Sequence, residues 1–132
     1  MTVRGKIVTI RTELAACYLP HLGVRRHTRV VTIAADGSLR GEDTVVLVRP
    51  AEIAWHWHTW VKVSARGAGF MLRGPGCAAR LSVAPEAGTT MRVQPEQFVA
   101  AYPHEGTVGT EIVVARHTAR AVFKWELAWV DA

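Results

Sequence analysis

The sequence predicts an all-β fold: a partial antiparallel β-sandwich of about eight to ten strands, with little or no helix. Three observations predict it. The apolar runs are short and rich in β-branched residues, Gly and Pro interrupt them at regular spacing, and none is long enough for the helix of a βαβ crossover. We therefore expect two packed antiparallel sheets, with a closed barrel as the alternative.

The N-terminal half carries the clearest strand patterns. Residues 3–10 alternate as one strand, and residues 28–34 form a second. The Asp36–Gly37 pair that follows predicts a hairpin with a type I′ turn, which needs positive φ at both central positions. Residues 44–48 are apolar on both faces, which indicates a central strand, and Pro50 is expected to end it.

Turn residues divide the C-terminal half at similar spacing. Turns are expected at Gly74-Pro75-Gly76, which consists of Gly and Pro, and at Glu86–Gly88, which ends in Gly. The strands expected here are residues 53–63, 69–73, 78–83, 89–93, 110–115 and 120–130. The last two are expected to form a separate pair joined by residues 116–119.

Length and composition indicate one globular domain, residues 1–132. A chain of 132 residues can bury a substantial core, and 49% hydrophobic with 20% charged residues is typical of a folded protein. The strand phases predict as core residues Val45, Leu47, Ile53, Val113 and Phe123.

The net charge of +5 comes almost entirely from arginine, since the chain has only three lysines. A guanidinium binds carboxylate or sulfate with two parallel hydrogen bonds, so this bias suits an anionic partner, although GC-rich coding produces the same bias. The densest cluster contains Arg25, Arg26 and Arg29, which we predict as a weak substrate-binding group. If residues 25–29 form a strand, Arg25, His27 and Arg29 share one face. No OB-fold or RNP-type signature accompanies the cluster, so no nucleic-acid partner is expected.

The cysteines and the N-terminus carry few signals. Cys17 and Cys77 are predicted to be two buried thiols, with a single disulfide as the alternative, because their spacing matches no metal or redox motif. The N-terminus has no continuous apolar stretch of signal-peptide length. No run approaches the roughly 18 apolar residues of a membrane span, so no membrane partner is expected.

His56 and His58 are two residues apart on an expected strand, so their side chains share one face and those of Trp55 and Trp57 share the other. Two imidazoles in this arrangement can be ligands of a metal such as zinc, with a third ligand from His27 or Asp43. Paired histidines on half-buried strands are more often packing residues. We therefore predict no metal cofactor, with these four residues as the candidates for a zinc site.

Tryptophan is abundant, with five residues in the chain. Buried indoles fill a sandwich core, whereas exposed ones stack on sugar rings. Core packing is expected for most of them, and Trp57 is the candidate for a substrate-binding surface.

Catalytic motifs of the common classes do not occur in the sequence. The two tyrosines, Tyr18 and Tyr102, both lie near turn residues. Glu42 and Asp43 are adjacent on an expected strand and point to opposite faces, so they cannot form an acid/base pair. For Asp43 we predict a structural hydrogen bond at the start of the central strand.

Four segments, read in order, resemble the C-terminal β-sandwich of the heparinase II/III-like polysaccharide lyases: CYLPHLGVRRHTRVVTIAADGSLRGEDTVV, AWHWHT, GFMLRG and EIVVARHTARAVFKWELAW. The resemblance extends from about Val8 to Val130. It implies β-elimination at uronate glycans such as heparin, heparan sulfate or alginate. In that family the catalytic Tyr and Asn lie in a helical toroid before the sandwich, and the further catalytic and metal-binding histidines lie in motifs that this chain lacks.

Within the resemblance, Tyr18, His27, Asp43 and His58 match the mainly structural part of the pattern, so it implies no catalytic residue here. We expect an accessory, non-catalytic domain that is inactive alone and has an acidic polysaccharide or a lyase toroid domain as partner. Homodimers are also expected, through a strand edge left unpaired.

Two alternatives stay open: a stand-alone glycan- or partner-binding module, and a small cupin-like metalloprotein based on the His pair alone. The chain shows no export signal. We expect a periplasmic or cell-envelope location if it is part of a full-length family member, and a cytoplasmic one otherwise.

Overall fold

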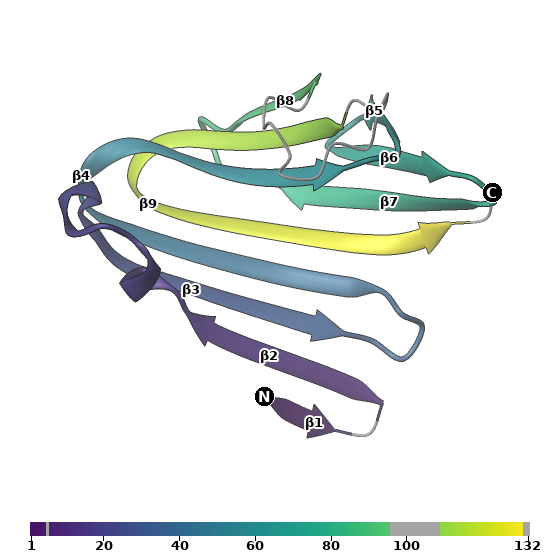
Figure 1. Ribbon diagram of the computed structural model, residues 1–132, viewed down its shortest axis with the longest axis horizontal. Helices are drawn as coiled ribbons and strands as arrows, with labels where there is room; N and C mark the ends of the chain where they lie inside the picture. The colour runs from purple at the N-terminus through teal and green to yellow at the C-terminus, as the bar shows by residue number, and fades with distance from the viewer. Residues whose placement is uncertain (5, 96–108, 131–132) are drawn as a thin grey trace.

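The computed structural model describes residues 1–4, 6–95 and 109–130. The predicted all-β fold is confirmed, because the described helical segments are two single 3-10 turns, η1 (Ala15–Cys17) and η2 (Pro20–Leu22). The strands, shown in Figure 1, are β1 (Thr2–Arg4), β2 (Ile7–Glu13), β3 (Val24–Ile33), β4 (Leu39–Thr59), β5 (Lys62–Arg66), β6 (Gly69–Gly74), β7 (Cys77–Ala84), β8 (Thr90–Pro95) and β9 (Thr110–Val130). No helix in this part of the chain is long and apolar enough to cross a membrane.

The two layers of the sandwich belong to one antiparallel sheet that folds over on itself. Its strand order is β1-β2-β3-β4-β9-β7-β6-β5, with β8 added on β9. β4 and β9 pair twice, first from Leu39–Leu127 to Val46–Arg120 and then from Ala51–Thr118 to Thr59–Thr110. Both strands curve round at the same end of the molecule (Figure 1), so the halves of this pair lie in different layers.

Four predicted strand boundaries are wrong, and the first two fall at this bend. Pro50 does not end a strand, because the β4–β9 ladder shifts register between Val46 and Ala51 and the proline lies in that irregular stretch. A proline has no N–H to donate, and a bulge is where a strand tolerates one. Residues 116–119 likewise lie inside the continuous strand β9, since both of its halves pair with β4.

The third wrong boundary is at the N-terminus, where residues 3–10 form a hairpin of β1 and β2 rather than one strand. Alternation continues through both strands of a short hairpin, so the pattern alone could not show the turn. The fourth is the strand expected over residues 53–63, since β4 ends at Thr59 and β5 begins at Lys62.

The Asp36–Gly37 hairpin is confirmed, but its turn type is not I′. Gly37 has φ of 79°, whereas no described non-glycine residue, Asp36 included, has positive φ. The Gly37 N–H donates to the Ala34 carbonyl at 3.0 Å, and Ala34 N–H donates to the Ser38 carbonyl at 2.9 Å. This is the three-residue loop with a left-handed glycine. This loop needs positive φ only at the glycine, and the Asp36 carboxylate supports it by accepting from Ser38 N–H at 2.9 Å.

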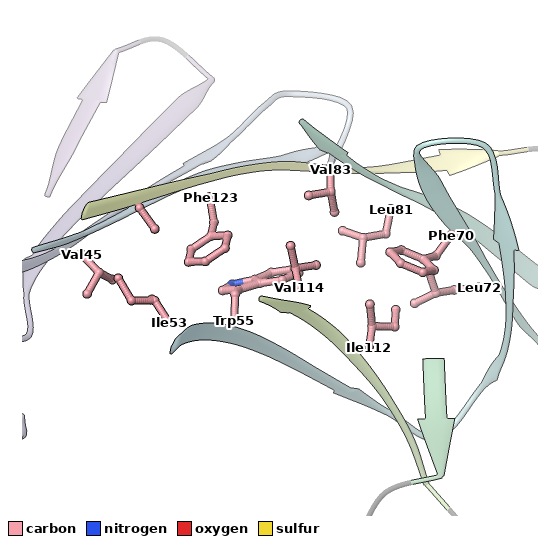
Figure 2. Packing of buried hydrophobic residues seen from close by; sticks show 11 residues of the cluster. Val45, Ile53, Trp55, Phe70, Leu72, Leu81, Val83, Ile112, Val114 and Phe123 are labelled. Atoms are coloured by element: carbon pink, nitrogen blue, oxygen red, sulfur yellow. The ribbon is translucent and has the colours of Figure 1, made fainter. Parts of the chain in front are cut away.

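The hydrophobic core lies between the two layers, with Trp55 near its centre (Figure 2). Of the predicted core residues, Val45, Ile53 and Phe123 belong to this cluster, and Leu47 packs against it partly buried. Val113 is fully buried, but it alternates with the cluster residues on either side of it and so faces away from them.

The two cysteines are not buried, which contradicts the prediction for them. Cys17 ends the η1 turn and Cys77 begins β7, and both thiols are exposed and unpaired. Small apolar neighbours in the sequence do not bury a residue that lies at a turn.

Candidate functional site

The first candidate site lies on the inner face of β3 and β4, around Asp43. This carboxylate is 1% exposed, and its Oδ1 accepts hydrogen bonds from His27 Nε2 at 3.1 Å and from Arg29 Nε at 2.6 Å. Trp125 of β9 approaches Oδ2 at 3.4 Å through its indole N–H. Asp43 makes structural hydrogen bonds as predicted, but not at the start of a strand, because β4 begins at Leu39. These contacts instead link three strands, β3, β4 and β9.

Tyr18 extends this network from the segment between η1 and η2. Its hydroxyl lies 2.7 Å from His27 Nδ1. Because a carboxylate faces Nε2, the hydrogen-bond network assigns the imidazole hydrogen to Nε2 and lets Nδ1 accept from the Tyr18 hydroxyl. Burial raises the pKa of Tyr18, with the charge of Arg29 acting in the opposite direction. The phenol therefore stays protonated at neutral pH.

The network lines a pocket of about 380 Å³ between the layers. Tyr18, His27, Arg29 and Asp43 form one wall of the pocket. Core residues such as Trp55 form much of the rest, and the exposed Glu52 and His56 also line it. The chain beside its mouth is apolar and exposed: Leu19 is 62% exposed, Leu22 53% and Val48 52%. These three residues, here called the apolar rim, are brought together by the η2 turn and by the hydrogen bond from Val48 N–H to the Gly23 carbonyl.

Glu13 of β2 holds the backbone of this wall. Its carboxylate accepts from the Thr28 hydroxyl at 2.8 Å and from the His27 N–H at 3.0 Å. These two bonds, in that order, lower the pKa of Glu13. Glu13 therefore fixes the strand position from which His27 reaches Asp43.

Of the residues expected to share one face of β3, His27 and Arg29 do so. Arg29 and His27 both point at Asp43, whereas Arg26 bonds to the Thr28 hydroxyl at 3.1 Å on the opposite face of β3. The strand has a register shift between Val24 and Arg26, which places Arg25 at the irregularity. Arg25 and Arg26 are exposed, and the side chain of Arg29 is 43% exposed.

Trp57, the predicted sugar-stacking residue, is partly buried against the core. Its ring centroid lies 5.7 Å from that of Trp55 and 5.5 Å from that of Trp125. The indoles that present most surface to solvent are Trp60, 52% exposed, and Trp129, 61% exposed.

The second candidate site lies on the outer face of β4, where His56 and His58 share one side as predicted. His56 Nδ1 lies 2.5 Å from the buried Glu111 Oε1, and His58 Nε2 lies 3.8 Å from the same oxygen. The partner strand is β9, which pairs His58 directly with Glu111. Within the described ranges, these three residues are the group whose ligand atoms all lie within 4.8 Å of one another, and it does not include His27 or Asp43.

His27 and Asp43 are poorly arranged for a cation. Both Asp43 oxygens already accept from donor groups, and the Arg29 guanidinium supplies the positive charge beside them. A metal at this carboxylate would have to displace the guanidinium. The residues present at this inner position therefore do not fit a metal ion.

The sequence did not predict Glu111 as part of these sites. The family resemblance grouped Tyr18 with His27 and Asp43, but the contact between Tyr18 and His27 was not predicted. Tyr18 reaches His27 from a turn, and no periodic pattern signals such a contact. Glu111 lies far from the histidines in the sequence, so only the pairing of β4 with β9 reveals it. Tyr102, the other tyrosine noted in the sequence, lies outside the described residues.

Fold and sites together define a small antiparallel sandwich with an inner and an outer histidine–carboxylate cluster. The family model "Heparinase II/III-like, C-terminal" matches residues 9–126, and the chain belongs to that family. Among solved structures, the heparan sulfate lyase HepC from Pedobacter heparinus is similar, with a TM-score of 0.78 and 9% identity. That match covers 99% of this chain and 21% of HepC, so the chain spans about a fifth of the HepC length. No curated protein matches the sequence.

Proposed function

We propose that this chain is an accessory, non-catalytic sandwich domain of a lyase that cleaves uronate-containing polysaccharides by β-elimination. Membership of the heparinase II/III-like C-terminal family supports a lyase context. The similar fold of HepC, a heparan sulfate lyase, supports a sulfated or carboxylated glycan as the substrate class.

The observation that carries the non-catalytic role is that the Tyr18 hydroxyl and the Asp43 carboxylate already have partners inside the pocket network. β-Elimination next to a uronate carboxylate needs a base within hydrogen-bond reach and a cation or amide on the carboxylate. Here the Tyr18 hydroxyl is bonded to His27, and the Arg29 guanidinium is bonded to Asp43. Burial raises the pKa of Tyr18, which opposes formation of the phenolate that could abstract a proton.

The partner that suits this chain is a lyase toroid domain docked over the pocket. The apolar rim at Leu19, Leu22 and Val48 is the kind of exposed surface that a partner covers, and it adjoins the polar network. In this arrangement the toroid supplies the base, and the sandwich supplies one wall of the cleft. A full-length protein of this kind would act in the periplasm or cell envelope. Homodimers formed through the β1 edge of the sheet are the competing mode of association.

The test measures unsaturated-uronate absorbance with heparan sulfate and with alginate. We expect none from this chain alone, and turnover when a family toroid domain is fused before it. Turnover by the chain alone that disappears in Tyr18→Phe would overturn the proposal. Turnover that disappears in His56→Ala or His58→Ala would instead favour the metalloenzyme alternative.

Docking is tested separately with Leu19→Asp, which places a charge on the apolar rim. Binding to the toroid domain should weaken at least tenfold, measured by calorimetry. The matched control is Val93→Asp on β8, an exposed apolar position outside the rim, which should leave binding unchanged. Equal effects of the two substitutions would remove the apolar rim as the docking surface.

A stand-alone glycan-binding module is the second candidate, and the exposed indole of Trp129 favours it. Trp129 is 61% exposed and offers a stacking surface, and the exposed Arg25 and Arg26 can attract anionic groups. Saturable binding of heparan sulfate oligosaccharides that is lost in Trp129→Ala, with no binding to a toroid domain, would select this alternative.

A further inference from the structure

The outer cluster combines two histidines and a carboxylate that come from different strands. His56 and His58 project from the same face of β4, and their rings are nearly parallel, with an interplanar angle of 11° and centroids 6.2 Å apart. Glu111 stands opposite His58 on β9. Three ligand atoms therefore converge: His56 Nδ1, His58 Nε2 and Glu111 Oε1.

Glu111 is the best-oriented member of the cluster. It is 3% exposed, and its pKa is lowered chiefly by the hydrogen bond from His56, against the opposing effect of burial. Its second oxygen, Oε2, accepts from the Gln94 side-chain amide at 2.6 Å. Oε2 is thus held by β8 while Oε1 is directed at the two imidazoles.

Arg92 in turn fixes the orientation of Gln94. The Arg92 Nε donates to Gln94 Oε1 at 2.9 Å, so the amide must present its NH₂ group to Glu111. Metal sites commonly hold a ligand carboxylate with hydrogen bonds from residues that do not touch the metal themselves. Gln94 and Arg92 would play that part for Glu111. An exposed ion pair does not need such supporting hydrogen bonds.

We propose that His56, His58 and Glu111 form a binding site for a first-row divalent cation, with zinc as the expected metal. Two imidazole nitrogens and one carboxylate oxygen are a ligand set that zinc takes with three protein ligands. The ion would take the place of the hydrogen shared by His56 and Glu111, and the His58 ring would close on it. The two imidazole side chains are 42% and 38% exposed, so an ion can reach them from solvent.

This site uses none of the four residues of the pocket network, Tyr18, His27, Arg29 and Asp43, although His56 also lines the pocket. The zinc site therefore does not rest on the proposed lyase function. The sequence suggested His27 or Asp43 as the third ligand beside His56 and His58. In the structure Glu111 takes that position instead.

The experiment uses the full chain, stripped of metal by a chelator and dialysed, then titrated with zinc chloride in a calorimeter. We expect one zinc per chain. His56→Ala and His58→Ala should each weaken binding more than tenfold, and Gln94→Ala about tenfold, the range typical for outer-shell residues. His117→Ala is the matched control, since His117 is an exposed histidine on β9 outside the cluster, and it should not change binding.

Cobalt substitution gives a second readout. Co²⁺ in a four-coordinate site of this kind should produce visible d–d absorption that zinc displaces and that His58→Ala abolishes. The variants are compared only after far-UV circular dichroism shows the same strand content. His58→Ala carries the test because its side chain is partly exposed, whereas Glu111→Gln changes a buried group.

Two results would overturn the site. One is a folded chain that shows no saturable zinc binding. The other is zinc binding that His58→Ala weakens no more than His117→Ala does, which would assign the metal to scattered surface histidines.

Discussion

The inner cluster around Asp43 and the outer cluster around Glu111 contain the same kinds of group but suit different roles. Each has a buried carboxylate bonded to a histidine, Asp43 with His27 and Glu111 with His56. At Asp43 the remaining acceptor positions are taken by an arginine and an indole, both of them donors that cannot leave without breaking the wall of the pocket. At Glu111 an amide holds one oxygen and the other faces two partly exposed imidazoles. The neighbours of a buried carboxylate therefore decide whether it serves as a structural hydrogen-bond acceptor or can bind a ligand.

Position in the sandwich reinforces the difference. Asp43 lies on the inner face, beside the core residue Val45, whereas Glu111 lies on the outer face of the other layer. An inner carboxylate needs permanent partners because water cannot supply them. An outer one can exchange a hydrogen for a cation that arrives from solvent.

The largest effect should follow from breaking the inner cluster. Asp43→Ala leaves His27 and Arg29 without their shared acceptor, and we expect it to lower the free energy of unfolding by about 3 kcal/mol. Urea denaturation followed by tryptophan fluorescence measures it. The neighbouring Glu42→Ala is the control, because Glu42 pairs with Lys124 at 3.6 Å between exposed side chains and should contribute less than about 0.5 kcal/mol. Equal losses would mean that the inner network is not structural.

The next largest effect is the stabilisation of the fold by zinc, which should depend on the outer cluster and not on the inner one. Zinc at about 100 times its Kd should raise the free energy of unfolding by about 2.7 kcal/mol. His27→Ala, which damages only the inner cluster, should keep this increase, and His58→Ala should lose it. Thermal unfolding with and without zinc measures both. A zinc effect that depends on His27 would place the metal in the pocket.

Acid should weaken the outer cluster through Glu111. Its pKa in the folded protein is below its ordinary value of 4.5, so its stabilising contribution is present above that pH and is lost as the pH falls through the lowered pKa. We expect metal-free protein to lose stability steadily below about pH 4.5. Glu111→Gln should flatten part of this decline, measured by urea midpoints at each pH. Asp36 and Glu13, whose pKa values are also lowered, should add to the decline in the same direction.

The smallest effect concerns anionic glycans. Arg25→Ala with Arg26→Ala should reduce the retention of the chain on immobilised heparin by less than tenfold, since exposed charges act through screened attraction. Arg29→Ala should reduce retention less, because its guanidinium is already bonded to Asp43. Elution in a salt gradient measures the order. A larger effect of Arg29 would show that the inner wall itself binds the glycan.

The amino-acid sequence by itself determined the fold class, most strands and the family. Alternation and turn residues are local, so they predicted the hairpin at Asp36–Gly37 and the opposite faces of His56 and Trp57. They could not predict the single sheet that bends into two layers, because the long ladder between β4 and β9 joins residues far apart in sequence.

Only the tertiary structure decided which residues meet. The ladder brings Glu111 to the histidines, and the η1–η2 segment brings Tyr18 to His27. Arg29 showed the same limit: in the sequence it belongs to a basic cluster, and in the fold it faces a carboxylate. The reason is physical. Side-chain periodicity records which face of a strand is buried, whereas strand pairing and register, which are non-local, choose the partners on that face.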